Sequence, residues 1–362
     1  MSQSGLQSVQ KRPVLSIFIG LLAVSLGYLL LWPVPFDPIA GPERQPNPAG
    51  TGVFAKNNEL AKAQLIDSGH GPEGIAFDGE GRLYTGLHNG DVVRLRLEGG
   101  FELIGNTGGR PLGLNFDAQG QLIIADAIAG LIAMAPDGTV TPLATDFEGK
   151  RMIFVDDLAI ASDGKIYFSD ASQRHAYGSD IIEVFERRPS GRLMVYDPRD
   201  KSLAVLLDDL YFANGVALSQ AEDFVLVNET FEHRIMRYWL DGPKAGTADV
   251  FIDNLPGYID NITEGPNGSF WLAVVSARAD ELDALVPAPF LRKVVWRIMQ
   301  LTGGSPAQQH SYAVKLDANG KPLVSLEDDS GHIYMMTSVL ERDAKLYLGS
   351  LTNHAIGVLP AP

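Results

Sequence analysis

The sequence predicts an all-β fold: one N-terminal transmembrane helix followed by a six-bladed β-propeller. Three observations support this prediction: a strand–turn–strand pattern recurs six times, no long helical segment separates the repeats, and an apolar run precedes them. The expected organisation is a cytoplasmic tail (1–12), the transmembrane helix (13–32), a Pro-rich linker (33–60) and the propeller (61–362). A pair of β-sandwiches is the alternative fold.

Each repeat combines an apolar strand, a polar turn and a second apolar strand, which together are typical of a β-hairpin. The repeats begin GPEGIAFDGEGRLYTG, GRPLGLNFDAQGQLIIAD, FVDDLAIASDGKIYFSD, FANGVALSQAEDFVLVNE, GYIDNITEGPNGSFWLAV and YMMTSVLERDAKLYLGS. Their spacing is irregular, roughly 40 to 75 residues, as expected for four-stranded blades with loops of different lengths.

The N-terminal segment predicts a membrane anchor. Lys11 and Arg12 precede an uncharged apolar run from Val14 to Trp32, which is long enough for a transmembrane helix. Positive charge before the run predicts a single-pass protein with a cytoplasmic N-terminus and its propeller on the periplasmic, extracytoplasmic or lumenal side. A signal peptide cleaved near Ala40 and a buried core helix are the alternatives. The Pro-rich segment that follows is expected to be a stiff, extended spacer.

Composition excludes several classes of function. The 362 residues include 44 acidic and 29 basic side chains, a balance that argues against a nucleic-acid-binding surface. The chain has no cysteine, which excludes disulfides, thiolate nucleophiles and cysteine-ligated zinc.

Aligning the repeats places one residue of each at the same position, just before its first strand. These residues are Glu73, Leu112, Asp156, Asn214, Asp260 and Thr337. The first strand of each blade lines the channel of a propeller, so these positions are expected to converge at one mouth. Four of them are carboxylates or amides, and Asn261 follows directly after Asp260. Oxygen donors without thiolates favour a hard cation, and a large irregular cage suits Ca²⁺ better than Mg²⁺. The simpler interpretation is that they are ordinary turn residues.

The segments GPEGIAF, FVDDLAI, FANGVALS and PGYIDNI resemble the strictosidine synthase-like group of calcium-dependent phosphotriesterase-type propellers. That superfamily includes gluconolactonases, regucalcin and paraoxonases. The resemblance covers nearly the whole chain and is greatest to the branch of adipocyte plasma membrane-associated protein-like members.

The resemblance implies a Ca²⁺ site formed by Glu73, Asp156, Asn214, Asp260 and Asn261. Asp156 replaces the asparagine usual at its position, which makes the site more anionic. Leu112 stands where paraoxonases carry a catalytic histidine, and Thr337 stands where true strictosidine synthases carry a catalytic glutamate. These departures argue against a histidine-assisted lactonase mechanism and against a Pictet–Spengler condensation.

The sequence favours a membrane-anchored, calcium-dependent hydrolase of small ester or lactone substrates. Asp260 is the first candidate for nucleophile or base, with a purely ligating role as the alternative, and His88 and His233 are further catalytic candidates. A non-catalytic binding module is the main alternative function, followed by a strictosidine synthase-type condensing enzyme.

Two insertions are expected to shape the substrate pocket: SQRHAYGSDIIEVFERRPSGR in the third blade and SARADELDALVPAPFLRKVVWRIM in the fifth. The second insertion predicts a lid, an amphipathic membrane-contacting element or a helix packed on the propeller.

Overall fold

Six four-stranded antiparallel sheets form a β-propeller in the computed structural model, which describes residues 11–96, 98–304 and 309–362. The first blade comprises β2 (Ile75–Phe77), β3 (Leu83–Gly86), β4 (Asp91–Leu95) and β5 (Phe101–Asn106). The second comprises β6 (Pro111–Phe116), β7 (Leu122–Asp126), β8 (Gly130–Met134) and β9 (Val140–Ala144). The third comprises β12 (Val155–Ile160), β13 (Ile166–Asp170), β14 (Gly191–Asp197) and β15 (Ser202–Leu210). The next two comprise β16 (Ala213–Leu218), β17 (Phe224–Glu229), β18 (Arg234–Trp239) and β19 (Ala248–Ile252); and β20 (Gly257–Glu264), β21 (Phe270–Ala277), β22 (Ser311–Leu316) and β23 (Pro322–Asp328). The predicted six-bladed β-propeller is confirmed.

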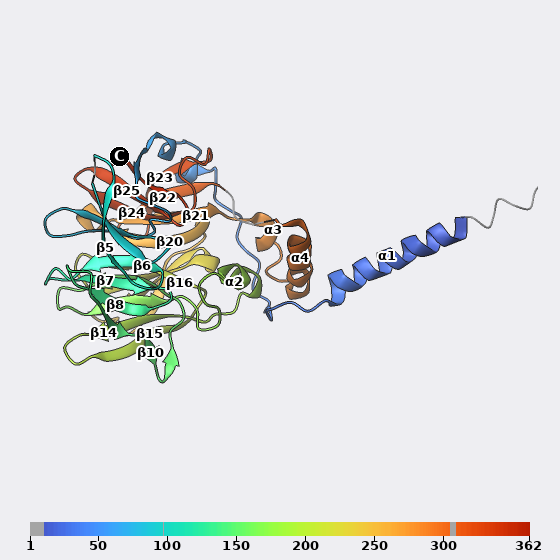
Figure 1. Ribbon diagram of the computed structural model, residues 1–362, viewed down its shortest axis with the longest axis horizontal. Coiled ribbons are helices and arrows are strands. Elements are labelled where there is room, and N and C mark those ends of the chain that lie inside the picture. The colour runs from blue at the N-terminus through green and yellow to red at the C-terminus, as the bar shows by residue number, and fades with distance from the viewer. Residues whose placement is uncertain (1–10, 97, 305–308) are drawn as a thin grey trace, which may run out of the picture.

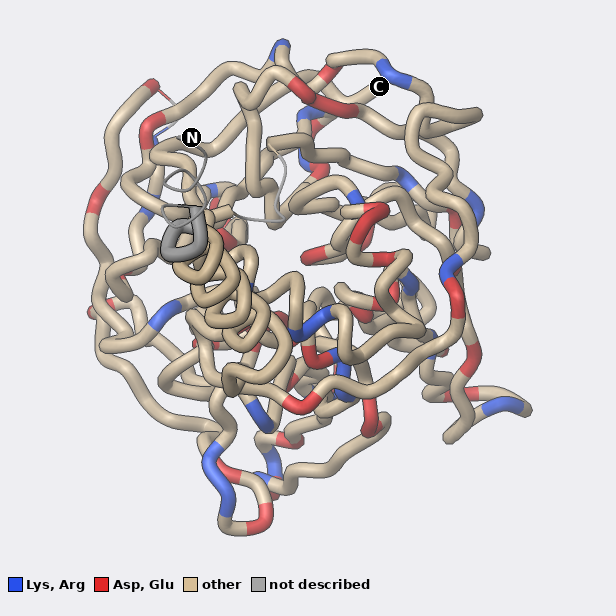
Figure 2. Tube along the Cα trace, turned by 90° about the vertical axis from the view of Figure 1, so that its right-hand side faces the viewer, with Lys and Arg blue, Asp and Glu red and all other residues tan. Residues whose placement is uncertain are grey.

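The sixth blade closes the ring with strands from both ends of the propeller. Its members are β24 (Met336–Arg342), β25 (Lys345–Ser350), β26 (Ala355–Pro360) and β1 (Gln64–Asp67). β1 pairs antiparallel with β26, which joins the N-terminal part of the domain to the last blade and leaves no gap in the ring. The chain traces this ring around one axis in Figure 2.

The core lies between neighbouring blades, where the apolar faces of adjacent sheets pack together. Val216 and Val225 of the fourth blade, for example, share one buried cluster with Tyr167 and Leu193 of the third. The remaining short elements are a hairpin, β10 (Asp146–Phe147) and β11 (Lys150–Arg151), and the 3-10 helices η1 (Gly52–Phe54), η2 (Leu60–Lys62), η3 (Thr230–Glu232) and η4 (Pro266–Gly268).

The N-terminal apolar run forms helix α1 (Lys11–Leu31), whose apolar side chains between Leu15 and Leu26 are exposed, as Phe18 is to 64%. Within the described residues, however, no helix is both long enough and apolar enough to cross a membrane. The predicted transmembrane span over Val14–Trp32 is therefore not shown.

The two insertions fold into helices on the side of the propeller that faces α1 (Figure 1). The third-blade insertion contains α2 (Asp180–Glu186), and the fifth-blade insertion contains α3 (Asp280–Asp283) and α4 (Pro289–Thr302). α4 contacts both α1 and α2.

The predicted Pro-rich spacer contacts these helices and the propeller. Phe36 is 7% exposed, and its ring lies 5.2 Å from that of Trp296 and 6.0 Å from that of Phe185. Arg44 forms an ion pair with Glu232 at 2.6 Å. This packing could not be predicted from the sequence, because the residues that the segment contacts lie far away in the chain.

Candidate functional site

The six aligned positions converge on one pocket of about 290 Å³. Its lining includes all of Glu73, Leu112, Asp156, Asn214, Asp260 and Thr337. Each comes from a different blade, and the pocket lies at the channel mouth on the side of α2, whose residues Ile181 and Val184 also line it.

A β-bulge interrupts the pairing of the inner strand at the aligned position in five of the blades. The register shifts between Val155 and Leu158 in β12, for example, and between Ile259 and Ile262 in β20. The corresponding shifts in β6, β16 and β24 fall between Pro111 and Leu114, Ala213 and Val216, and Met336 and Ser338. Consecutive residues of a regular strand point to opposite faces, whereas a bulge re-aims a side chain. The bulge in β20 therefore brings consecutive Asp260 and Asn261 to the same region.

Glycine follows the aligned residue where inner strands approach one another most closely. A Cβ atom on Gly74 would lie 2.0 Å from the carbonyl oxygen of Leu112, and one on Gly215 would lie 2.5 Å from that of Asp260. These positions have no room for a side chain, which explains the Glu-Gly and Asn-Gly pairs in the repeats.

Three carboxylates form the floor of the pocket. Oxygen atoms of Glu73, Asp156 and Asp260 lie within 4.8 Å of one another, and the side chains are buried. Burial raises the pKa of Glu73 to about 7, although the charge of Arg110 opposes this. Burial and repulsion between neighbouring carboxylates raise the pKa of Asp156 and of Asp260 well above the ordinary value. Such a cluster is electrostatically costly unless a cation neutralises it.

The amide oxygens beside these carboxylates have no hydrogen-bond partner in the described part of the chain. Oδ1 of Asn214, Oδ1 of Asn261 and Oε2 of Glu73 are buried and unpartnered. The Asn261 side-chain amide donates to Glu73 Oε1 at 2.9 Å, which leaves its own oxygen free. Carboxylate and amide oxygens in this arrangement fit a hard cation such as Ca²⁺. We call Glu73, Asp156, Asn214, Asp260 and Asn261 the oxygen cage.

The backbone around Glu73 is fixed by the sixth blade. The hydroxyl of Thr337 donates to the carbonyl oxygen of Glu73 at 3.1 Å, and the Ser338 hydroxyl donates to the same oxygen. Thr337 therefore holds the Glu73 backbone, whereas Leu112 adds an apolar surface.

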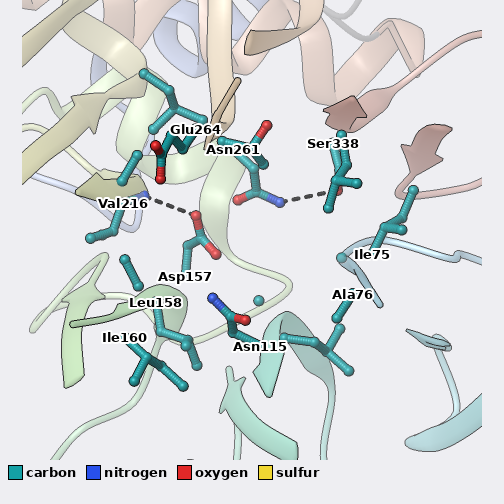
Figure 3. Close-up of a pocket in the computed structure, with 18 of the residues that line it drawn as sticks. Ile75, Ala76, Asn115, Asp157, Leu158, Ile160, Val216, Asn261, Glu264 and Ser338 are labelled. Atoms are coloured by element: carbon teal, nitrogen blue, oxygen red, sulfur yellow. Dashed lines mark hydrogen bonds between the residues drawn. The ribbon is translucent and has the colours of Figure 1, made fainter. Parts of the chain in front are cut away.

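A second cavity, of about 480 Å³, lies in the channel on the other side of the oxygen cage. Asn261 and Asp157 both face it (Figure 3). Asp157 Oδ2 accepts a hydrogen bond from the Val216 backbone amide at 2.8 Å, and burial raises the pKa of Asp157 to about 8. Asp157 was not among the predicted site residues, although its position directly after Asp156 in the sequence was a signal that could have identified it.

Five aromatic residues line the pocket next to the oxygen cage, and we call them the aromatic wall. Its members are Phe154, Tyr177, Phe212, Phe231 and Tyr258, all of which line the pocket. Neighbouring ring centroids lie 4.9 to 6.0 Å apart, so the rings form a continuous chain of contacts. This wall could not be predicted from the sequence, because its members come from loops and strand ends of different blades.

The two candidate histidines have different surroundings. His88 lines the pocket, and its Nδ1 lies 3.4 Å from the Tyr177 hydroxyl. His233 does not line the pocket: it is buried, with Nδ1 2.9 Å from the carbonyl oxygen of Gly257 and Nε2 3.5 Å from Asp283 Oδ1. His233 is thus part of a buried polar network that joins the fourth and fifth blades.

A second group of metal-ligand type, His175, Glu183 and Glu186, lies around α2. Arg174 already pairs with Glu186 at 2.9 Å, and His175 Nε2 lies 2.7 Å from the same carboxylate. Protein groups therefore satisfy this cluster without an ion.

Comparison with known proteins agrees with this architecture. The family models "Strictosidine synthase-like, N-terminal" and "Strictosidine synthase" match residues 52–95 and 156–243. Adipocyte plasma membrane-associated protein of Rattus norvegicus is 36% identical over 93% of this chain and 96% of its own. Protein STRICTOSIDINE SYNTHASE-LIKE 13 of Arabidopsis thaliana is 32% identical over 97% of this chain and 95% of its own.

The chain belongs to the strictosidine synthase-like family. Solved structures share the fold of this strictosidine synthase-like chain at low identity. A gluconolactonase from Xanthomonas campestris has a TM-score of 0.61 and 17% identity, and covers 90% of this chain and 99% of its own. Regucalcin from Agrobacterium tumefaciens, a calcium-binding protein, has a TM-score of 0.56 and 15% identity, over 82% and 94%. The predicted family is confirmed.

Proposed function

We propose that this protein is a calcium-dependent hydrolase of small esters or lactones. The observation that carries the proposal is the oxygen cage, in which three buried carboxylates and the unpartnered amide oxygen of Asn214 lie at the floor of an apolar pocket, with Asn261 hydrogen-bonded to Glu73 behind them. The fold shared with a gluconolactonase and with a calcium-binding regucalcin supports it. A bound calcium ion would act as a Lewis acid toward the substrate carbonyl.

The pocket favours substrates with an apolar body. The aromatic wall and Leu112 offer few polar contacts, so an aryl or alkyl ester fits better than a polyhydroxylated lactone. A cavity of about 290 Å³ has room for a small molecule of this kind.

Asp260 and His88 are the residues that we propose for proton transfer. Asp260 lies on the floor of the pocket, where one oxygen can ligate the cation while the other faces the substrate. Partial burial, and then the charges of Arg110 and His70, lower the pKa of His88. The His88 ring is therefore neutral at neutral pH and able to accept a proton at the pocket rim.

A non-catalytic binding module is the second candidate function. Leu112 and Thr337, which line the pocket without a titratable group, favour it. Thr337 also argues against a condensing activity that needs a carboxylate at this position.

We further propose that α1 and α4 attach the protein to a lipid surface. α4 carries an outward stripe of apolar residues, in which Leu291, Ile298 and Leu301 are 48%, 44% and 66% exposed. Arg297 joins α4 to the exposed helix α1 by donating to the carbonyl oxygens of Leu29 and Trp32. Exposed apolar surface of this extent is typical of an interaction site, and relatives are named plasma membrane-associated proteins.

The experiment that tests the proposed activity is hydrolysis of phenyl acetate and of a γ-lactone by the full-length protein, with calcium and with a chelator. We expect turnover that needs calcium. Absence of hydrolysis across a broad panel of esters and lactones, with calcium bound, would instead favour the binding module.

A further inference from the structure

Helix α2 separates the candidate pocket from the other helices of the insertions. Its residues Ile181 and Val184 line the pocket, and both also pack against a buried cluster that contains Phe36, Phe185 and Trp296. Val184 packs in addition against the buried cluster that holds three rings of the aromatic wall. The wall of the pocket is therefore one short helix at this place, and a displacement of α2 would change the pocket.

Two buried arginines of α4 connect α2 to α1, and these three helices follow one another away from the propeller (Figure 1). Arg292 is 1% exposed, and its Nη1 donates to the carbonyl oxygens of Phe185 and Glu186 at the end of α2, at 2.9 and 3.4 Å. Arg297 is 4% exposed, and it donates to two carbonyl oxygens at the C-terminal end of α1. Guanidinium groups complement the unpaired carbonyls at helix C-termini. α4 thus binds the ends of both helices.

The segment that follows α1 completes the docking site of α2. The backbone amide of Asp37 donates to Glu186 Oε1 at 2.9 Å, and the amide of Ile39 donates to the Glu186 carbonyl oxygen at 3.2 Å. The guanidinium of Arg292 also donates to the carbonyl oxygen of Ile39. The C-terminal end of α2 is therefore bound by α4 and by this segment together.

The backbone of α2 allows it to move as a unit. Gly178, just before the helix, has a φ of +86°, and Arg187, directly after it, has a φ of +52°. Residues at the ends of an element can absorb the rotation of a hinge. α2 has only seven residues, and no side-chain hydrogen bond caps its N-terminus among the described residues. A helix this short is unstable alone, so its order depends on the groups that it packs against.

We propose that attachment of α1 and α4 to a lipid surface orders α2 and thereby completes the wall of the pocket. The inference rests on the lipid attachment proposed above but not on hydrolysis. When α2 is docked against α4, the outward stripe of α4 lies beside the exposed helix α1, so both apolar surfaces can meet the same lipid surface. Lipid that binds this arrangement more tightly than one with α4 displaced shifts α2 toward its docked position.

The test is hydrogen–deuterium exchange of the backbone amides of residues 180–186 in the full-length protein, with and without phosphatidylcholine vesicles. Co-sedimentation of the same samples measures lipid binding. We expect vesicles to slow exchange in α2 of the wild type by about five- to a hundredfold.

Arg297→Gln should still bind the vesicles, because the apolar residues of α1 and α4 are unchanged, but it should lose most of this protection of α2. Arg199→Gln is the matched control, since it removes an arginine whose side chain is 62% exposed in the turn between β14 and β15. We expect it to behave like the wild type.

The possible failures are distinguishable. Vesicle binding without slower exchange in wild-type α2 would overturn the inference alone, and this result needs no variant to fold. A folded Arg297→Gln protein that binds vesicles and keeps the full protection would show that α4 does not transmit the lipid contact. Absence of co-sedimentation would refute the lipid attachment and the inference together. None of these measurements needs turnover, so they do not depend on the proposed hydrolase.

Discussion

At the scale of single residues, the oxygen cage concentrates negative charge where water is excluded. Glu73, Asp156 and Asp260 are 2%, 3% and 9% exposed, and burial is the main cause of each raised pKa. Such groups are most stable when neutralised, so a cation that binds only the folded protein should stabilise it.

The first prediction concerns Glu73→Gln, which keeps the shape of the side chain but removes its charge. Calcium should raise the melting temperature of the wild type, and the rise should be smaller in the variant because calcium binds it about ten- to a hundredfold more weakly, a loss of about 1.4 to 2.7 kcal/mol. Differential scanning fluorimetry over a calcium titration measures this. Glu102→Gln, on the exposed strand β5, is the control, and an equal shift in all three proteins would refute the cage.

The second prediction concerns Asp260→Asn, which retains an oxygen ligand but cannot accept a proton. We expect kcat for phenyl acetate to fall by about 10²- to 10⁴-fold while a weakened calcium-dependent thermal shift persists. Steady-state kinetics and scanning fluorimetry separate the two effects, with Asp163→Asn in an exposed turn as the control. Unchanged kcat would remove Asp260 from the mechanism, and loss of both signals would make it primarily a ligand.

At the scale of secondary-structure elements, the helical insertions are fixed to the propeller by buried charges. Asp283 of α3 accepts from Arg278 at 2.7 Å and lies 3.5 Å from Nε2 of His233. These partners overcome the effect of burial and lower the pKa of Asp283 to about 2.

The third prediction is the pH dependence of this contact. Because the folded pKa lies below the unfolded value, Asp283 stabilises the protein fully above about pH 4, and this contribution disappears as pH falls toward 2. Asp283→Asn should therefore lower the free energy of unfolding by about 2 kcal/mol at pH 7 and by progressively less below pH 4. Urea denaturation at several pH values measures the difference. A difference independent of pH would contradict the assignment.

The fourth prediction tests the outward stripe of α4. Ile298→Glu and Leu291→Glu should reduce co-sedimentation of the full-length protein with phosphatidylcholine vesicles several-fold, because each places a charge where apolar contact is expected. Leu323→Glu is the matched control, since Leu323 and Leu291 are both 48% exposed but Leu323 lies on β23 of the propeller. Equal binding by all four proteins would exclude α4 from the lipid contact.

Local features of the fold could be predicted from the sequence, and long-range features could not. The polar turns and apolar strands of each repeat predicted the blades, because both signals lie within a single hairpin. The bulges of β12 and β20 could not be predicted, since a register shift is a property of a strand and its partner. The contacts of Phe36 with α2 and α4 also depend on residues far away in the chain.

The candidate site shows the same division. Aligning the repeats identified the six aligned residues that line the pocket. In a propeller, residues at equivalent positions of successive repeats lie close together around the central axis. The aromatic wall lies outside that alignment, so only the packing of different blades reveals it. The contacts of His233 with Gly257 and Asp283 likewise could not be predicted from the sequence.

At the scale of the whole molecule, the pairing of β1 with β26 keeps the ring closed, and the oxygen cage depends on that closure because its ligands come from four blades. The fifth prediction is that deleting residues 1–32 leaves a folded propeller, whereas deleting residues 1–67 removes β1 and the buried side chains of Leu60 and Ile66. Circular dichroism and denaturant unfolding should show a cooperative transition only in the first protein. A cooperative, calcium-binding 1–67 deletion would show that the ring closes without β1.

We propose that the oxygen cage holds the ion on which hydrolysis depends. The most direct test is the rate of aryl ester hydrolysis by the full-length protein as a function of free calcium, after removal of bound metal. We predict no activity without calcium and a saturable rise, whose midpoint matches the dissociation constant from the thermal shift and moves to higher calcium in Glu73→Gln. Hydrolysis that persists unchanged in the metal-free protein would show that the oxygen cage does not hold a catalytic ion.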